Sequence, residues 1–259
     1  MNNLKPNISN LISIESVNEA CNKNYEDMML KYYQLQFGWF HNAYKAFKDI
    51  DKYVILAYLV NKTLSFYNKY FFNLSFDKFY SKKSLEIEKI SISEIVRELK
   101  LSKETARRKL NELTQDGIIV RDKKKITIQS NAFSYQKPII TIQNFSNFLS
   151  TSSKYLKINN NFKSQNSEYF EEQIKKNYTH YWNDFLNFQI ELILRFKDVF
   201  LNYENVIVFC VCLLNQAYNM KNSDQKIEAE NTNLMHDMYT NTITRYTLEN
   251  SKGLNPTTI

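Results

Sequence analysis

The hydrophobic positions in the first third of the chain recur at helical spacing. Residues 1–25 are mostly polar, and we expect them to form a loosely held arm. From Tyr25 onward, the apolar residues between Met29 and Phe47 lie mostly three or four positions apart, so they fall on one side of a helix. The segment Asp51–Asn68 is apolar on more than one face, which predicts a central helix.

The second half of the chain returns to helical patterns after a polar interval. Beyond Gln129 the composition shifts to Ser and Asn, with a short strand predicted at Ile139–Gln143 and a flexible linker at Asn159–Ser167. The segment Glu168–Val199 predicts one long helix, and Glu204–Met220 predicts a second, apolar one.

Residues 90–120 have the pattern of two short helices joined by a tight turn. Ser91 followed by Glu94 predicts a capping box for the first helix, and Ser102 predicts the N-cap of the second. Gly117 supplies a left-handed stop after the second helix. Apolar or small side chains point inward from both helices and from the turn: Ile92, Ile95, Val96, Leu99, Leu101, Ala106, Leu110 and Leu113.

A two-stranded β-hairpin is predicted directly after these helices. Its strands are Ile118–Arg121 and Lys125–Gln129, joined by a tight turn at Asp122–Lys124, and Ile126 and Ile128 alternate with polar partners. Two such helices with a hairpin are typical of a winged helix-turn-helix. The sequence therefore predicts a mainly α protein with one winged helix-turn-helix, which has a three-helix core and a β-hairpin wing.

The composition supports a helical fold. Gly and Pro occur three times each in 259 residues, whereas β-sandwiches, barrels and phosphate-binding folds need many turns and Gly-rich loops. The sequence contains neither GxGxxG nor GxxxxGK[ST]. Because 43% of the residues are hydrophobic, a packed interior is expected.

The positive charge of the chain is concentrated in the winged helix. The formal net charge is +7, and residues 97–125 alone contain ten basic and five acidic side chains, a difference of +5. Four of the six arginines lie in the same segment. Arginine is suited to bidentate contacts with phosphates and guanine edges, so this concentration indicates an anionic partner.

The segment Ser102–Arg108 resembles the recognition helix of the cyclic-AMP receptor protein family, whose pattern is Ser-Arg-Glu-Thr, two further residues, and Arg. The resemblance covers at most about 45 residues, and it differs at Lys103 and Arg107. It implies base-edge contacts from Lys103, Glu104 and Arg108, and phosphate contacts from Ser102 and Thr105. The Gly-rich sensor barrel of that family has no counterpart here, so no cyclic-nucleotide ligand is implied.

These residues predict sequence-specific binding of double-stranded DNA by a transcriptional regulator. In the major groove, Arg108 could donate two hydrogen bonds to guanine, and Glu104 could accept one from cytosine. The remaining predicted DNA contacts are Arg107, Arg121 and the wing lysines Lys123, Lys124 and Lys125, and the wing lysines are expected to hold phosphates. The alternative is a winged-helix protein-interaction or replication-assembly module without base-specific reading of DNA, and RNA is a third partner class.

The two halves of the chain resemble each other. The segment Tyr53–Asn61 aligns with Ile207–Asn215 at an offset of 154 residues, and residues 85–86 and 91–95 align with 248–249 and 255–259 at offsets of 163 and 164. Residues 168–259 are therefore interpreted as an incomplete repeat of the first half, one that stops where a second helix-turn-helix would begin. Chance similarity between apolar helices is the alternative.

The predicted division is an N-terminal helical region (1–84), the winged helix-turn-helix (85–130), a linker (131–167) and a second helical region (168–259). The three histidines stand apart, and the three cysteines fit a reducing cytoplasm better than a disulfide framework. We expect no enzymatic activity, cofactor, metal or membrane span. A homodimer is expected, and the sequence names no small-molecule ligand.

Overall fold

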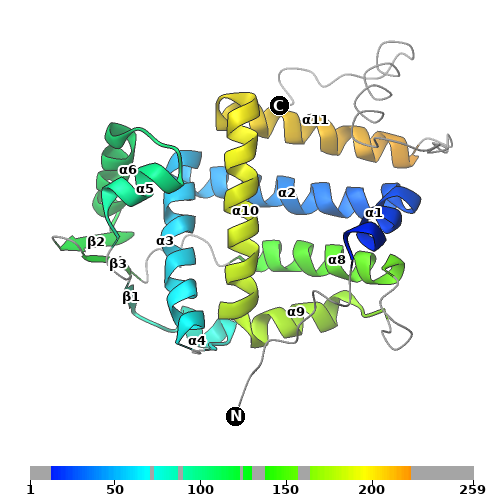
Figure 1. The fold of residues 1–259 in the computed structure, drawn as a ribbon, viewed down its shortest axis with the longest axis horizontal. Coiled ribbons are helices and arrows are strands. Elements are labelled where there is room, and N and C mark those ends of the chain that lie inside the picture. The colour runs from blue at the N-terminus through cyan, green and yellow to red at the C-terminus, as the bar shows by residue number, and fades with distance from the viewer. Residues whose placement is uncertain are drawn as a thin grey trace. The chain divides into compact units, whose positions relative to one another are not determined.

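The computed structural model describes residues 13–70, 73–86, 90–122, 125–129, 138–156 and 164–222, with side chains through residue 215 and without those of Glu86 and Lys125. The described chain is mainly helical with one small antiparallel sheet, so the predicted fold class is confirmed (Figure 1). In chain order the elements are α1 (Ile14–Lys23), α2 (Tyr25–Phe47), α3 (Ile50–Lys69), α4 (Phe76–Tyr80), β1 (Ser84–Glu86), α5 (Ile92–Glu98), α6 (Lys103–Gln115), β2 (Ile119–Asp122), β3 (Lys125–Gln129), α8 (Ile139–Tyr155), α9 (Ser167–Lys176), α10 (Tyr178–Phe200) and α11 (Tyr203–Asn222).

The chain folds into two units whose boundaries fall inside helices. One unit holds α1, α2 as far as Phe37, α8 from Gln143 and α11 from Val208. The other unit holds the rest of α2, all elements from α3 to β3, the first turn of α8, α9 from Glu168, α10, and α11 as far as Ile207. The predicted regions 1–84 and 168–259 each contribute residues to both units.

Helix α3 is the centre of the unit that carries the winged helix. It packs along α10 and also against α6, and ten of its twenty residues are buried. A polar network joins α3 to α10: the buried Asn183 amide donates to Asn61 Oδ1 (2.6 Å) and Ser65 Oγ (2.9 Å), and Asn68 donates to Asn183 Oδ1 (3.1 Å). Amides bonded on both sides fix one register between the two helices.

An aromatic cluster lies where α4 packs against α10. The ring of Tyr178 lies 5.3 Å from the rings of both Phe76 and Phe79, and it stacks on Trp182 at 5.6 Å. The hydroxyl groups of Tyr178 and Tyr80 share a hydrogen bond of 2.9 Å. Such tilted and edge-on ring pairs add to the free energy of burial.

In the other unit, α2 packs with α8 and α11. The ring of Tyr32 lies 5.8 Å from that of Phe148, and the Tyr155 hydroxyl donates to Asp27 Oδ2 at 2.7 Å. The hydroxyl groups of Tyr25 and Tyr33 share a hydrogen bond of 2.7 Å. Burial raises the pKa of Tyr32 to about 12, and the Tyr33 hydroxyl and the Cys210 thiol of α11 contribute to that rise.

The prediction of a short strand at Ile139–Gln143 is wrong, because these residues form the first turn of α8. The carbonyl of Pro138 accepts the N–H of Ile142 at 2.9 Å, and Ile142 and Ser146, four residues apart, are both fully buried. The short apolar run alternates over too few residues to distinguish a strand from a helix. Most of the segment 131–167 that is described is therefore helix rather than linker.

Two helix boundaries also differ from the prediction. Part of the expected N-terminal arm is α1, which is capped by Ser13, whose side chain accepts the N–H of Ser16 at 3.1 Å. The long helix predicted over Glu168–Val199 is divided at Asn177 into α9 and α10. The predicted helices at Asp51–Asn68 and Glu204–Met220 correspond to α3 and α11.

The lengths of three successive helices recur 153 residues later in the chain. Helices α1 and α9 each have 10 residues, α2 and α10 each have 23, and α3 and α11 each have 20. Their first residues are 14 and 167, 25 and 178, and 50 and 203. This register is one residue shorter than the 154 of the sequence alignment. The aligned segments 248–249 and 255–259 lie outside the described residues.

Replacing Asn183 by Ala should lower the free energy of unfolding by about 1–3 kcal/mol, because the buried Asn61 and the half-buried Asn68 each lose a hydrogen-bond partner. Urea titration followed by circular dichroism measures this change. Asn22→Ala on α1 is the control, since Asn22 is exposed and should shift stability by less than about 0.5 kcal/mol. Equal effects of the two substitutions would contradict the role of the network.

Candidate nucleic-acid interface

Only the Ser91 half of the predicted capping box forms at the start of α5. Ser91 Oγ accepts the N–H of Glu94 at 3.0 Å, but the Glu94 carboxylate turns away and accepts from the Tyr58 hydroxyl (3.1 Å) on α3. It also pairs with Lys62 at 3.0 Å. Burial acts to raise the pKa of Glu94, but Lys62 and Tyr58 outweigh it and lower the pKa. The Glu94 side chain therefore links α5 to α3 instead of completing the predicted capping box.

Helix α6 has the inward face that the sequence predicts. Ala106, Leu110 and Leu113 are fully buried. Gly117 has φ 69°, and the N–H of the next residue, Ile118, donates to the Leu113 carbonyl at 3.0 Å. This left-handed stop at a glycine ends the helix and turns the chain into β2.

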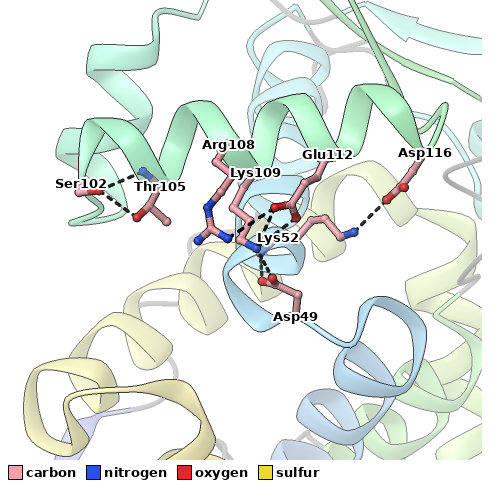
Figure 2. Close-up of polar contacts among 8 residues, drawn as sticks. All are labelled: Asp49, Lys52, Ser102, Thr105, Arg108, Lys109, Glu112 and Asp116. Carbon is pink, nitrogen blue, oxygen red and sulfur yellow. Dashed lines mark hydrogen bonds and ion pairs between the residues drawn. The ribbon is translucent and has the colours of Figure 1, made fainter.

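Lys109 of α6 is bound on the inner side of the helix, where it holds α6 against the start of α3 (Figure 2). Its side chain is only 7% exposed and forms ion pairs with Asp49 and, at 3.1 Å, with Glu112. Asp49 also accepts the N–H of Lys52 at 2.9 Å and so caps α3. The Lys52 ammonium pairs with Asp116, at the other end of α6, at 2.8 Å.

These ion pairs shift the pKa values of the groups involved. Partial burial acts to raise the pKa of Asp49, yet the bonds from Lys109 and from the Lys52 N–H outweigh it and lower the pKa. Burial acts to lower the pKa of Lys109, but Asp49 and Glu112 raise it. The charged forms of Asp49 and Lys109 are therefore the ones that the fold stabilises.

The solvent-facing side of α6 carries the three predicted base-edge residues, Lys103, Glu104 and Arg108. Lys103, Glu104, Arg107 and Arg108 are all exposed, and the same side continues through Asn111 and Gln115. The Arg108 side chain is 61% exposed and lies 3.7 Å from the Glu112 carboxylate, a loose contact across one helical turn. Four predicted contacts are thus gathered on one surface of one helix.

Ser102 and Thr105 lie at the N-terminus of this helix. Ser102 Oγ accepts the N–H of Thr105 at 3.0 Å, and its hydroxyl donates to Thr105 Oγ1 at 2.8 Å (Figure 2). Both side chains therefore shape the cap. The N-terminus of a helix carries a partial positive charge, which favours a phosphate at the same position.

The predicted wing is part of a three-stranded sheet with the order β1-β3-β2. Leu85 of β1 pairs with Ile128, and Ile119 of β2 pairs with the same residue from the other side. The hairpin prediction omitted β1, because three residues before the first helix of the motif give no alternation to read. Ile126 and Ile128 are buried, as the pattern predicts.

The described wing contributes one predicted contact. Arg121 of β2 donates to Asn111 Oδ1 of α6 at 3.0 Å, which holds this guanidinium beside the exposed side of the helix. Lys123 and Lys124 lie outside the described residues. The backbone of Lys125 pairs with Asp122 in the sheet.

Sequence reasoning missed the residues that orient α6. Asp49 and Lys52 lie about 60 residues before Lys109, and Lys109 itself was counted with the basic residues of the motif. Its position three residues after the inward Ala106 and beside Leu110 was the available signal, because residues three apart share a helix face.

Other site types receive no support from the described residues. No group of three His, Cys, Asp or Glu side chains there could hold a metal ion. Among the same residues no single helix is long and apolar enough to cross a membrane, although α10 and residues 203–215 of α11, bent by 99°, pass that test as a pair.

Comparison with protein families shows that residues 85–123 match the DeoR-like helix-turn-helix domain. The match runs from β1 through both helices to the start of the wing, and it supports DNA binding by a transcriptional regulator with double-stranded DNA as its partner. The resemblance to the cyclic-AMP receptor protein family stays a prediction. Neither the curated proteins nor the solved structures contain a match to the chain.

The ion pairs around Asp49 predict an acid-sensitive fold. Because the folded-state pKa of Asp49 is lowered below its unfolded value of about 3.9, its contribution to stability is present above that pH and is lost as the pH falls through the folded-state pKa. Asp49→Asn should keep the helix cap while removing the charge. Its stability should therefore fall less steeply than that of the wild type between pH 5 and pH 2.5, as urea titrations at each pH would measure.

Asp77→Asn on α4 is the matched control for this substitution, since that carboxylate is exposed. Its pH dependence should follow the wild type. A wild-type slope in Asp49→Asn would show that the pair with Lys109 does not contribute.

Proposed function

We propose that this chain is a non-enzymatic transcriptional regulator of the cytoplasm that binds double-stranded DNA sequence-specifically through α6. The observation that carries the proposal is the division of α6 into two sides. One side is fixed to α3 by Lys109 and the buried apolar residues, and the other exposes Lys103, Glu104, Arg107 and Arg108. A rigidly held helix with a polar, mainly basic outer side is suited to the major groove.

The exposed side chains take different roles in this proposal. Arg108 donates two hydrogen bonds to a guanine edge, and Glu104 accepts from a cytosine amino group, each worth about 1–3 kcal/mol of discrimination. Ser102, Thr105 and Arg107 contact phosphates or flanking bases at the N-terminal half of the helix. Arg121 and the wing lysines hold the backbone of the duplex and add salt dependence rather than base preference.

The described residues hold one recognition helix, which reads one half-site. We therefore propose that two copies of the chain bind a pair of half-sites whose centres are about one helical turn, roughly 34–36 Å, apart. A selection of bound sequences from a random DNA library tests the proposal directly. Enrichment of a two-fold related motif is expected, whereas no enrichment would favour the protein-interaction alternative.

Arg108→Ala should weaken specific binding by about 1–3 kcal/mol and relax the preference at one base position, because a bidentate base contact is lost. Fluorescence anisotropy with a panel of duplexes, each changed at one position, measures both effects. Arg195→Ala is the matched control, since Arg195 is exposed on α10, where it pairs with Glu191 at 2.5 Å. Equal losses on specific and random DNA would assign Arg108 to the phosphate backbone instead.

The role of the wing is tested by the salt dependence of DNA binding. Replacing Lys123, Lys124 and Lys125 together by Ala should weaken binding to all duplexes alike and reduce the slope of log K against log salt by up to about 3, roughly one unit per phosphate contact. Titrations at four salt concentrations give the slope. An unchanged slope would remove these residues from the interface, and a change in base preference would assign them a different role.

A further inference from the structure

Helices α9 to α11 repeat the capping details of α1 to α3 at the same offset of 153 residues. Lys48 and Leu201, the residues after α2 and α10, both have positive φ, 53° and 69°. Each is followed by a capping side chain: Asp49 accepts the N–H of Lys52, and Asn202 accepts that of Asn205 at 2.8 Å. A non-glycine residue rarely adopts positive φ, so its recurrence between helices of equal length indicates one repeated structure.

Two further pairs of residues follow the same offset. The side-chain amides of Asn24 and Asn177 both donate to the carbonyl four residues earlier, at 3.1 Å and 3.4 Å. Gln36 and Gln189 are both buried, with no hydrogen-bond partner for their amides within the described part of the chain. Helix α11 is therefore the counterpart of α3.

The counterpart helices differ in what covers them. One side of α3 faces the winged helix. This side consists of Asp49, Lys52, Ile55, Leu59 and Lys62. The ion pairs with Lys109, Asp116 and Glu94 border it, and Ile55 and Leu59 between them are fully buried. The equivalent residues 153 positions later define the open face of α11: Asn202, Asn205, Val208, Cys212 and Asn215.

The open face of α11 is exposed where the face of α3 is buried. Val208, the counterpart of Ile55, is 41% exposed, and Cys212, the counterpart of Leu59, is also exposed. All three charged docking residues of α3 are replaced by asparagine. A winged helix of the type found in this chain therefore could not dock on α11 through the same ion pairs.

The chemistry of the open face suits contact with an identical surface. A two-fold axis places each face against its own copy, where like charges would repel, but the five residues of this face are uncharged. From Asn205 to Asn215 they are spaced three, four and three apart, which is the spacing of a seam between two packed helices. Asparagine in such a seam can bond to the asparagine of the partner helix.

We propose that the open face of α11 is the surface through which two copies of this chain associate. The proposal rests on the proposed function in one respect: two half-sites require two recognition helices, and each described chain carries one. The duplicated scaffold would then use the third helix of each copy differently, α3 to hold the winged helix and α11 to join a second chain.

Val208→Asp tests the surface, because it places two carboxylates against each other across the two-fold axis. Sedimentation without DNA should give twice the 30.9 kDa chain mass for the wild type and one chain mass for the variant. Val199→Asp is the matched control, since Val199 is 72% exposed on α10 and outside the open face, and this variant should remain a dimer. A monomeric wild type, or a Val208→Asp dimer, would overturn the proposal.

Labelling of Cys212 gives a second measurement that needs no disruptive substitution. In a Cys21→Ser background, maleimide should react with Cys212 in dilute protein at least tenfold faster than in concentrated protein, while the buried Cys210 stays unreactive. A Cys212 that is reactive at every concentration would show that the face stays open. A Cys212 that is protected at every concentration would show that the face is covered within one chain, and either result would overturn the proposal.

The two proposals fail in distinguishable ways. Binding to a duplex with a single half-site depends on α6 alone, so Val208→Asp should leave its affinity within twofold of the wild type. Binding to two half-sites should lose its cooperativity in the same variant. A dimer that binds no duplex would contradict the DNA-binding function and leave the interface supported.

Discussion

The position of α6 depends on the ion pair between Lys109 and Asp49. Lys109 extends from the inner side of α6, and Asp49 is the N-cap of α3, so Asp49 both caps a core helix and orients α6. A buried cation without its partner is costly, which restricts α6 to the orientation that keeps the pair. Lys52 and Asp116 bind the far end of α6 to α3, and Glu94 does the same for α5.

Helix α3 can support α6 because α3 is itself held against α10. Asn61, Ser65 and Asn68 bond to Asn183 of α10, and these bonds select a single register between two helices that apolar packing alone would leave freer to slide. Helix α3 thus supports α5 and α6 on one side and packs along α10 on another.

Helices α3 and α11 have the same length but present different surfaces. The caps at Asp49 and Asn202 perform the same local task, since both side chains accept the N–H of the residue three positions later. Only the aspartate carries the charge that Lys109 needs. Replacing charge by amide at this position and at the positions of Lys52 and Lys62 keeps the helix and removes the docking site.

Features that depend only on neighbouring residues were predictable from the sequence. Ser91, Ser102 and Gly117 act within one turn of their own helices, and Ala106, Leu110 and Leu113 follow helical spacing, so these caps, the stop and the inward face were all predictable. The exposed positions of Lys103, Glu104, Arg107 and Arg108 follow from the same periodicity.

Tertiary structure decided everything that joins distant segments. A pattern cannot show that Lys109 meets Asp49, because the pairing depends on how α6 lies on α3 and not on either helix alone. For the same reason β1 was missed, since three residues become a strand only beside β3. The segment Ile139–Gln143 was predicted as a strand, although Pro138 and the spacing of Ile142 and Ser146 make it helical. Local propensity is weak over so few residues, and burial against distant partners outweighs it.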